Sequence, residues 1–330
     1  MNKLSFPRKR LVIIGLAVLA AVLLIVAPFV ANRYLLGVMI SLLITALLGQ
    51  SWNLMSGYAG QFSFGHAVFF GLGAYTSSLL SVHFGFSPWC GMLCGMAVAA
   101  AVGILIGYLS FRYRLRGDYF ALATLAFAEI FRVLFNNLKV FGGAQGINLP
   151  LAQKNDFLQF RFVGDSAYYF IALFMTAGVT LFLFLMSKRR FGLNLVAIKT
   201  NRDAAGALGV NVLQHQLLAI AISAAIAAMA GTLYAQYYGF IDPTVVFDAS
   251  ISVRAIVPCI IGGSGTVFGP LLGALIIVPI QELCNGVFEG IGGLNMILYG
   301  GLIVVFVLFC PNGILGIVRK LSDRRKEKRS

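Results

Sequence analysis

Long, continuously apolar stretches recur along the whole chain and are separated by short polar segments. A stretch of about 20 apolar residues is long enough to cross the ~30 Å hydrocarbon core of a bilayer as an α-helix. The stretches do not alternate with polar residues, which indicates helices rather than the strands of a membrane barrel. Only 11% of the residues are charged, against about a quarter in soluble domains. The sequence therefore excludes an ordinary soluble domain and predicts an all-α, polytopic transmembrane helical bundle.

We expect about eight to ten spans, some of them broken at glycine-rich turns. The first apolar stretch is too long for a signal-peptide core and lacks a good cleavage site, so we interpret it as a span. The stretch 251–261 has only eleven residues, or about 16 Å as a helix, which indicates a broken span. The ten predicted spans are residues 11–31, 34–55, 67–83, 89–111, 119–136, 167–186, 217–238, 251–261, 271–288 and 294–310.

The formal net charge of +14 invites a nucleic-acid interpretation, which the positions of the basic residues argue against. Four patches between or beyond the spans hold 19 of the 25 Lys and Arg residues: 3–10, 112–116, 188–202 and 319–329. This is the positive-inside pattern, and it places both termini in the cytoplasm. We therefore predict contact with anionic lipid and no nucleic-acid partner. The predicted parts are a basic N-terminus (1–10), a transmembrane domain (11–318) with a cytoplasmic loop (187–216), and a basic tail (319–330).

The cytoplasmic loop contains a short segment with signals for both ends of a helix. Thr200 and Asp203 have the spacing of a capping box, and Gly209 stands where a helix end favours a left-handed residue. The helix between these signals has about eight residues, or ~12 Å. We predict that it binds another protein. The residues predicted for this contact are Thr200, Arg202, Asp203, Ala204, Ala205 and Gly209.

Two glycine-rich turns, 56–66 and 262–270, lie between apolar stretches. Unwound backbone at membrane depth survives only where protein or a water-filled cavity surrounds it, and paired interruptions indicate a transport pathway. Close helix packing through small residues is the competing interpretation. In a ten-span bundle both turns face the same side, which a simple inverted repeat does not predict. The candidate pathway residues are Gly57, Gly60, Gln61, Ser63, Gly65, His66, Gly262, Gly263, Ser264 and Gly265.

Four charged residues lie within predicted spans, where ionisable groups are costly and mark pathways or interfaces. Glu129 and Arg132 are three residues apart and are expected to pair on one helix face, as a structural pair, a subunit contact or a contact to solute. Arg254 and Glu282 flank the second glycine-rich turn, and their opposite charges allow a second pair.

The sequence predicts no catalytic residue and no metal site, because its three histidines and five cysteines have no ligand spacing. The chain contains no Gly-Lys dipeptide and therefore no phosphate-binding loop of the Gly-x-x-x-x-Gly-Lys-Ser/Thr type. If ATP drives this protein, a different polypeptide binds it.

Two sets of motifs resemble known transport proteins. The segment Asp203-Ala204-Ala205 with Gly209 resembles the E-A-A-x-x-x-G loop of bacterial ABC importer permeases, with Asp for Glu and without the later Ile-x-Leu-Pro. A series over roughly residues 35–318 is similar to LivM-type permeases of high-affinity branched-chain amino-acid importers. It consists of GYAGQFSFGHAVFFGLGAY (57–75), LRGDYFALATLAFAEIFR (115–132), GGAQGI (142–147), AISAAIAAMAGTLYA (221–235), GGSGTVFGPLLGA (262–274) and LYGGLIVVFVLFCPNGILG (298–316).

The resemblance implies an ABC importer permease in the bacterial inner membrane that carries Leu, Ile or Val; related permeases carry urea or short amides. It implies a second, LivH-like permease, two ATPase subunits that bind ATP and Mg²⁺, and a periplasmic amino-acid binding protein. In the family the short loop helix docks in a groove on the ATPase. The alternative class is an ion-coupled secondary transporter, which also uses broken helices but does not need the capped cytoplasmic helix.

Overall fold

The computed structural model describes residues 27–28, 31–113, 115, 117–150, 154–287, 300–301 and 313–316. The predicted basic ends (1–10 and 319–330), nearly all of the first and last predicted spans, and part of the basic patch at 112–116 lie outside the described residues. Within the described part, seven helical segments are long and apolar enough to cross a membrane.

The described part is almost entirely helical, as predicted. The α-helices are α2 (Arg33–Trp52), α3 (His66–Phe84), α4 (Pro88–Arg112), α5 (Asp118–Asn137), α6 (Asp165–Ser187), α7 (Arg190–Thr200), α8 (Arg202–Ala207), α9 (Val212–Tyr238), α10 (Pro243–Val246), α11 (Ala249–Gly262) and α12 (Gly269–Val287). A π-helix, η1 (Asn53–Tyr58), continues α2, and two 3₁₀ turns, η2 (Lys139–Phe141) and η3 (Gly143–Gln145), follow α5. Strands β1 (Ile147–Asn148) and β2 (Phe240–Ile241) form one antiparallel pair.

Two predicted spans differ from the structure. The stretch predicted as an eleven-residue broken span is part of a longer unit, because α11 has 14 residues and α10 precedes it. Asp242 and Asp248 begin these two helices by accepting hydrogen bonds from backbone N–H groups of the first turns. The predicted span 119–136 is helix α5, which carries Asp118, Glu129 and Arg132 and is not among the seven candidate spans.

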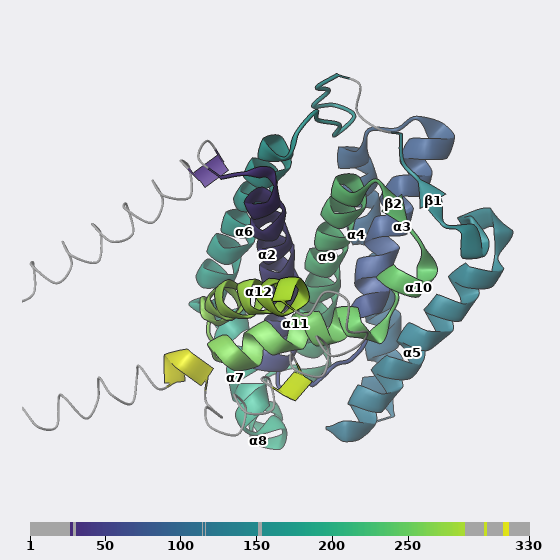
Figure 1. Ribbon diagram of the computed structural model, residues 1–330. Coiled ribbons are helices and arrows are strands. Elements are labelled where there is room, and N and C mark those ends of the chain that lie inside the picture. Colours follow the sequence, from purple (N-terminus) through teal and green to yellow (C-terminus); the bar gives the residue numbers. More distant parts are fainter. Residues whose placement is uncertain are drawn as a thin grey trace, which may run out of the picture.

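Helix α9 occupies the middle of the bundle, where it contacts α2, α3 and α4 (Figure 1). Its closest approach is to α3: a Cβ atom on Gly231 would overlap the Phe70 carbonyl oxygen, and one on Gly73 would overlap the Ala228 carbonyl oxygen. Small residues at such contacts let helix backbones approach and gain dispersion energy, which matters where lipid removes the hydrophobic driving force. Packing of small residues therefore builds the centre of the fold.

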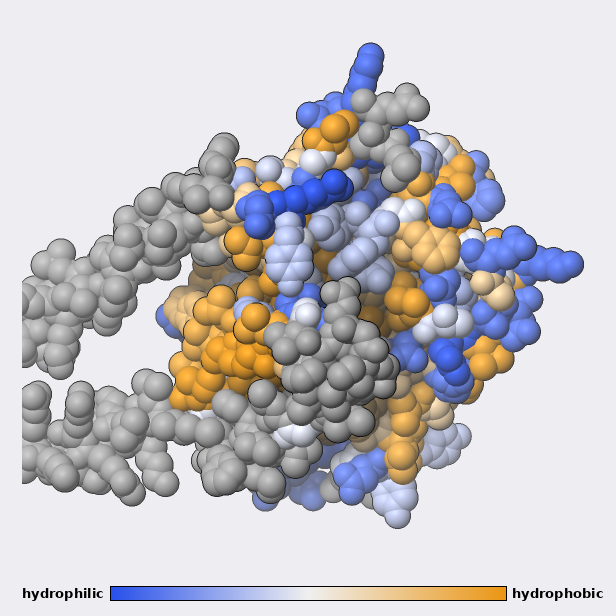
Figure 2. Space-filling model, in the orientation of Figure 1, coloured by the Kyte–Doolittle hydropathy of each residue, from blue (hydrophilic) through white to orange (hydrophobic). Residues whose placement is uncertain are grey.

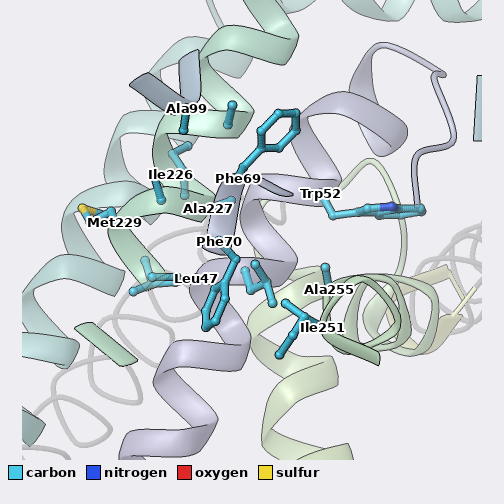
Figure 3. Packing of buried hydrophobic residues seen from close by; sticks show 14 of the residues in the cluster. Leu47, Trp52, Phe69, Phe70, Ala99, Ile226, Ala227, Met229, Ile251 and Ala255 are labelled. Carbon is cyan, nitrogen blue, oxygen red and sulfur yellow. The ribbon is translucent and has the colours of Figure 1, made fainter. Parts of the chain in front are cut away.

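Apolar side chains fill the space around this contact. Those of α2, α3, α4, α9 and α11 converge in one buried cluster (Figure 3), which includes Leu47, Trp52, Phe69, Phe70, Ala99, Ile226, Ala227, Met229, Ile251 and Ala255. Helices α11 and α12 pack on each other and on α2, and they cross the direction of α2 and α9 (Figure 1). We call the end of the bundle that carries α8 the inner end and the opposite end the outer end.

The α3–α9 contact gives a direct stability prediction. Gly231→Ala places a methyl group against the Phe70 carbonyl oxygen, and overpacking of this kind costs about 1–3 kcal/mol. We expect a lower melting temperature of the purified protein in detergent. Gly178→Ala in α6 is the matched control, because a Cβ there meets nothing within 4 Å and alanine is the better helix former. Equal melting temperatures for the two variants would contradict the packing described here.

Candidate coupling site

A two-helix arm, residues 188–211, connects the inner ends of α6 and α9. Helix α7 begins directly after α6, and Gly192 lets it fold back closely, since a Cβ there would lie 2.7 Å from Ser187 Cα. Leu195 and Ile198 of α7 are buried, and α7 contacts both α9 and η1. The predicted cytoplasmic loop is thus largely helical, and α7 is a helix that the sequence analysis did not predict.

The N-terminus of α8 corrects the predicted cap. Asn201, not Thr200, is the capping residue: its Oδ1 accepts hydrogen bonds from the N–H groups of Asp203 (3.1 Å) and Ala204 (3.0 Å). Thr200 is the last residue of α7, and its hydroxyl donates to the Val196 carbonyl oxygen at 2.9 Å. Asparagine is at least as good a capping residue as threonine, so the cap shifts by one position and α8 has six residues rather than about eight.

The C-terminus of α8 confirms the glycine signal. Gly209 has φ +85°, in the left-handed region. Its N–H donates to the Gly206 carbonyl oxygen, and the Val210 N–H donates to the Ala205 carbonyl oxygen, which is the hydrogen-bond pattern of a Schellman motif. Helix α8 is therefore short but fixed at both ends.

Helix α8 presents most of its surface to solvent. Ala205 is buried at 4% exposure, whereas Asp203, Ala204, Gly206 and Ala207 are exposed. Leu208, directly after the helix, is 86% exposed. An apolar side chain so exposed beside small residues on a short, capped helix suits contact with another protein. Leu208 carries no signal in the sequence that marks it as a contact residue.

Lys199, in the last turn of α7, joins the arm to the first glycine-rich turn. Its ammonium group donates a hydrogen bond of 2.8 Å to the Gly57 carbonyl oxygen. Its side chain also passes so close to Gly60 that a Cβ there would lie 2.9 Å from Lys199 Cγ. Gly60 has φ +71°, a second reason for glycine at this position. In the sequence, Lys199 is only one of several basic residues that obey the positive-inside rule.

Asn53, the first residue of η1, joins the two glycine-rich turns. Its Nδ2 donates to the Thr266 carbonyl oxygen at 2.8 Å, and its Oδ1 accepts from the Gly265 N–H at 2.8 Å. A Cβ on Gly57 would lie 2.7 Å from the Gly265 nitrogen. The two turns therefore lie against each other at the inner end, on the same side of the bundle as the ten-span arrangement predicts.

The rest of the first turn is held by buried hydrogen bonds. The Trp52 indole donates to the Ser63 carbonyl oxygen (2.8 Å), and the Ser56 hydroxyl donates to the Gln61 carbonyl oxygen (2.7 Å). A Cβ on Gly65 would lie 3.0 Å from the Thr124 carbonyl oxygen. His66 is fully buried, with Nε2 3.0 Å from the hydroxyl oxygen of Ser223 in α9. These contacts bring α2, α3, α5 and α9 together around the turn.

The second glycine-rich turn, 262–270, is packed as closely as the first. A Cβ on Gly262 would overlap the Gly269 carbonyl oxygen, and Gly263 and Gly265 have φ +120° and +79°. Ser264 is exposed. Two cavities in the described part, of about 550 and 720 Å³, are lined by other residues. The close contacts explain the glycines, and the pathway role of the ten candidate residues stays a prediction.

The four charged residues predicted to lie within spans are not part of the candidate coupling site. Arg132 donates hydrogen bonds to both carboxylate oxygens of Glu129, at 2.9 and 2.5 Å. The two side chains are 35% and 56% exposed on α5, so the pair lies on the surface of the described part. No ion pair joins Arg254 to Glu282 among the contacts of the described residues.

Fold and site together define a class: a multi-pass membrane protein in which a capped helix at the inner end is linked to unwound segments within the bundle. The chain belongs to the family described as branched-chain amino acid transport system/permease component, whose model matches residues 34–307.

Several relatives extend this assignment. The high-affinity branched-chain amino acid transport system permease protein LivM of Escherichia coli K12 is 31% identical over 96% of this chain and 77% of the relative. The permease protein LivH of the same system and strain is 24% identical over 82% of this chain and 91% of the relative. The probable branched-chain amino acid transport permease protein LivM of Methanocaldococcus jannaschii is 25% identical over 82% of this chain and 89% of the relative. No solved structure matches the chain.

The left-handed residue at the end of α8 leads to a local prediction. Gly209→Val forces a β-branched residue to φ near +85°, which costs about 1–2 kcal/mol. We expect backbone amides of residues 204–210 to exchange hydrogen about 5- to 30-fold faster. Gly206→Ala is the control, because the nearest atom to its Cβ is 3.9 Å away, and we expect slower exchange there. Unchanged exchange in Gly209→Val would disprove the role of this glycine.

Proposed function

We propose that this chain is the transmembrane permease subunit of an ATP-driven importer of branched-chain amino acids (Leu, Ile and Val). It resides in the bacterial inner membrane with both termini in the cytoplasm and has no catalytic activity of its own. The family assignment and the similarity to LivM of Escherichia coli over nearly the whole chain support the substrate class. The observation that carries the mechanism is the link from α8 through Lys199 to both glycine-rich turns.

In this proposal α8 is the contact to a separate ATPase subunit, which binds ATP and Mg²⁺. Its exposed small residues and Leu208 fit a groove, and its two capped ends let it move as one piece. A movement of α8 reaches Lys199 within three residues and hence the Gly57 carbonyl. The Gly57 carbonyl belongs to η1, and Asn53 at the start of η1 is hydrogen-bonded to Gly265, shortly before α12. The movement can therefore pass from η1 to the start of α12. The arm thereby converts closure of the ATPases into a change at the inner end of the translocation pathway.

The remaining partners follow from the relatives. LivM and LivH of one Escherichia coli system both match this chain, which supports a pair of similar permease subunits around a shared pathway. We propose a LivH-like second permease, two ATPase subunits and a periplasmic amino-acid binding protein that selects the solute. Transport of urea or short amides, and coupling to an ion gradient without an ATPase, are the alternative outcomes.

The first test replaces a residue on the exposed face of α8. Ala204→Arg places a long charged side chain on the proposed contact surface, and we expect ATP-driven leucine uptake by the reconstituted complex to fall at least tenfold. Copurification of the ATPase subunits should fall with it, while membrane insertion is unchanged. Ala204→Ser, which keeps a small side chain, is the control and should transport normally. Normal uptake by Ala204→Arg, or uptake by the wild-type chain without ATPases, would reject the proposal.

The second test removes the link and leaves the contact surface intact. Lys199→Gln loses a charge-assisted hydrogen bond worth about 1.5–3 kcal/mol. If the whole of this free energy is added to the activation barrier of transport, the rate of uptake falls about 10- to 150-fold. We expect slow leucine uptake with continued ATP hydrolysis and normal copurification of the ATPases. Lys188→Gln, which removes a cation from the face of the Phe184 ring at the start of the arm, is the control and should stay within twofold. Wild-type uptake by Lys199→Gln would show that this hydrogen bond does not transmit the movement.

A further inference from the structure

A cavity of about 550 Å³ lies in the outer half of the bundle, among α2, α6, α9 and α12. Asp165 begins α6 and Tyr238 ends α9, whereas α8 lies beyond the other end of both helices (Figure 1). Helix α6 alone has 23 residues, or about 34 Å. The cavity is therefore separated from the coupling site by about the thickness of a membrane, and its size is typical of small-molecule sites.

Charged and polar side chains dominate the lining. One face of α2 contributes residues in its first three turns, and the other helices contribute an acid or a tyrosine. The lining residues are Arg33, Tyr34, Gly37, Val38, Ser41, Asp165, Tyr237, Tyr238 and Glu282. Hydrophilic and weakly polar side chains gather over the outer part of α2 and α9, beside a strongly hydrophobic surface further from that end (Figure 2).

The charged side chains of the cavity comprise one ion pair and one acid without an ion pair among the described residues. Arg33 and Asp165 neutralise each other at its rim, with Nε 3.4 Å from Oδ2. Glu282 has no ion-pair partner among the described residues, although it lies on an apolar helix that is a candidate span. A carboxylate in such a position is costly and by default marks a functional site. Glu282 is therefore the acid of this lining that forms no ion pair among the described residues.

Tyr237 and Tyr238 add hydroxyl groups and aromatic rings to the lining of the cavity. A Cβ on Gly37 would lie 3.2 Å from the Tyr237 hydroxyl oxygen, so glycine at this position makes room for that hydroxyl. The Tyr237 and Tyr238 rings contact each other, with centroids 5.0 Å apart. Their hydroxyls suit hydrogen bonds to a polar head group, and their rings suit an apolar side chain or the face of an ammonium group.

We propose that this cavity is a receiving site for the zwitterionic head of an α-amino acid, with Glu282 binding its ammonium group. At the rim, Arg33 faces Asp165 with its Nε, and its terminal guanidinium N–H groups are the donors for the carboxylate of the amino acid. The tyrosine rings accept a branched apolar side chain. The site rests on the proposed function, because it names where the solute enters this subunit from the binding protein. A belt of interfacial tyrosines would explain the rings, but it would not explain the unpaired carboxylate.

The experiment combines transport with a chemical probe of the cavity. In the reconstituted full complex, Glu282→Gln keeps the shape and removes the charge, and we expect leucine uptake to fall at least tenfold. ATP hydrolysis stimulated by the binding protein should stay within twofold. Asp156→Asn removes an acid from the exposed outer loop, outside the cavity lining, and should leave both activities within twofold.

Val38→Cys provides the second measurement. Modification of this thiol by cationic and anionic methanethiosulfonate reagents is followed by mass spectrometry of its peptide. We expect the cationic reagent to react at least fivefold faster, and the preference to disappear when Glu282→Gln is added.

The two measurements distinguish the outcomes. Loss of both uptake and reagent preference in Glu282→Gln supports the site. Normal uptake in Glu282→Gln, or lost uptake with an unchanged reagent preference, overturns it. In either case leucine uptake by the wild-type complex keeps the proposed function intact. If the wild-type complex imports no leucine, the proposed function fails, and the reagent preference still decides whether Glu282 makes the cavity attract cations.

Discussion

The Asn53 side chain is the contact on which the inner end of this bundle depends. An asparagine amide can donate and accept at once, and Asn53 uses both groups on one partner turn, at Thr266 and Gly265. It is fully buried, so loss of either bond would leave a polar group without water, at a cost of about 1–3 kcal/mol. Two unwound segments more than 200 residues apart are thereby held as one unit. Lys199 then attaches the two-helix arm to that unit.

Local signals in the sequence predicted most of the helices and the end of α8. Continuous apolar stretches predicted α2, α3, α4, α6 and α9, with helix ends within a few residues of those in the structure. Gly209 has the predicted left-handed conformation. The predicted pairing of Glu129 with Arg132 also forms, because both lie within one helix turn. These features depend on residues close together in the chain, which is the range over which sequence patterns carry information.

The features that sequence reasoning missed depend on distant residues or on competition between neighbours. Asn201 and Thr200 are both capable caps, and the choice between them is set by where α7 ends. Nothing near Lys199 in the sequence indicates that its partner is Gly57, 142 residues away. The outer cavity needs four helices to form, and Glu282 was interpreted as a partner of Arg254 because both flank the same turn. A single sequence without tertiary contacts contains no signal for any of these.

Helix α2 with η1 connects the two ends of the molecule. Its first turns line the outer cavity, and its π-helical continuation begins at Asn53, in the junction of the turns. A π-helical segment makes i→i+5 hydrogen bonds and is less favourable than an α-helix, so it persists where surrounding contacts hold it. Here the Ala59 N–H donates to the Leu54 carbonyl oxygen, five residues back, and the Gln61 N–H closes the end of the segment on the Met55 carbonyl oxygen, six residues back. A change of η1 toward α-helical hydrogen bonding would rotate the residues after it relative to α2. In the proposed importer, η1 is therefore the place where a movement delivered by Lys199 would enter the helix that also carries Ser41 and Val38 at the opposite end.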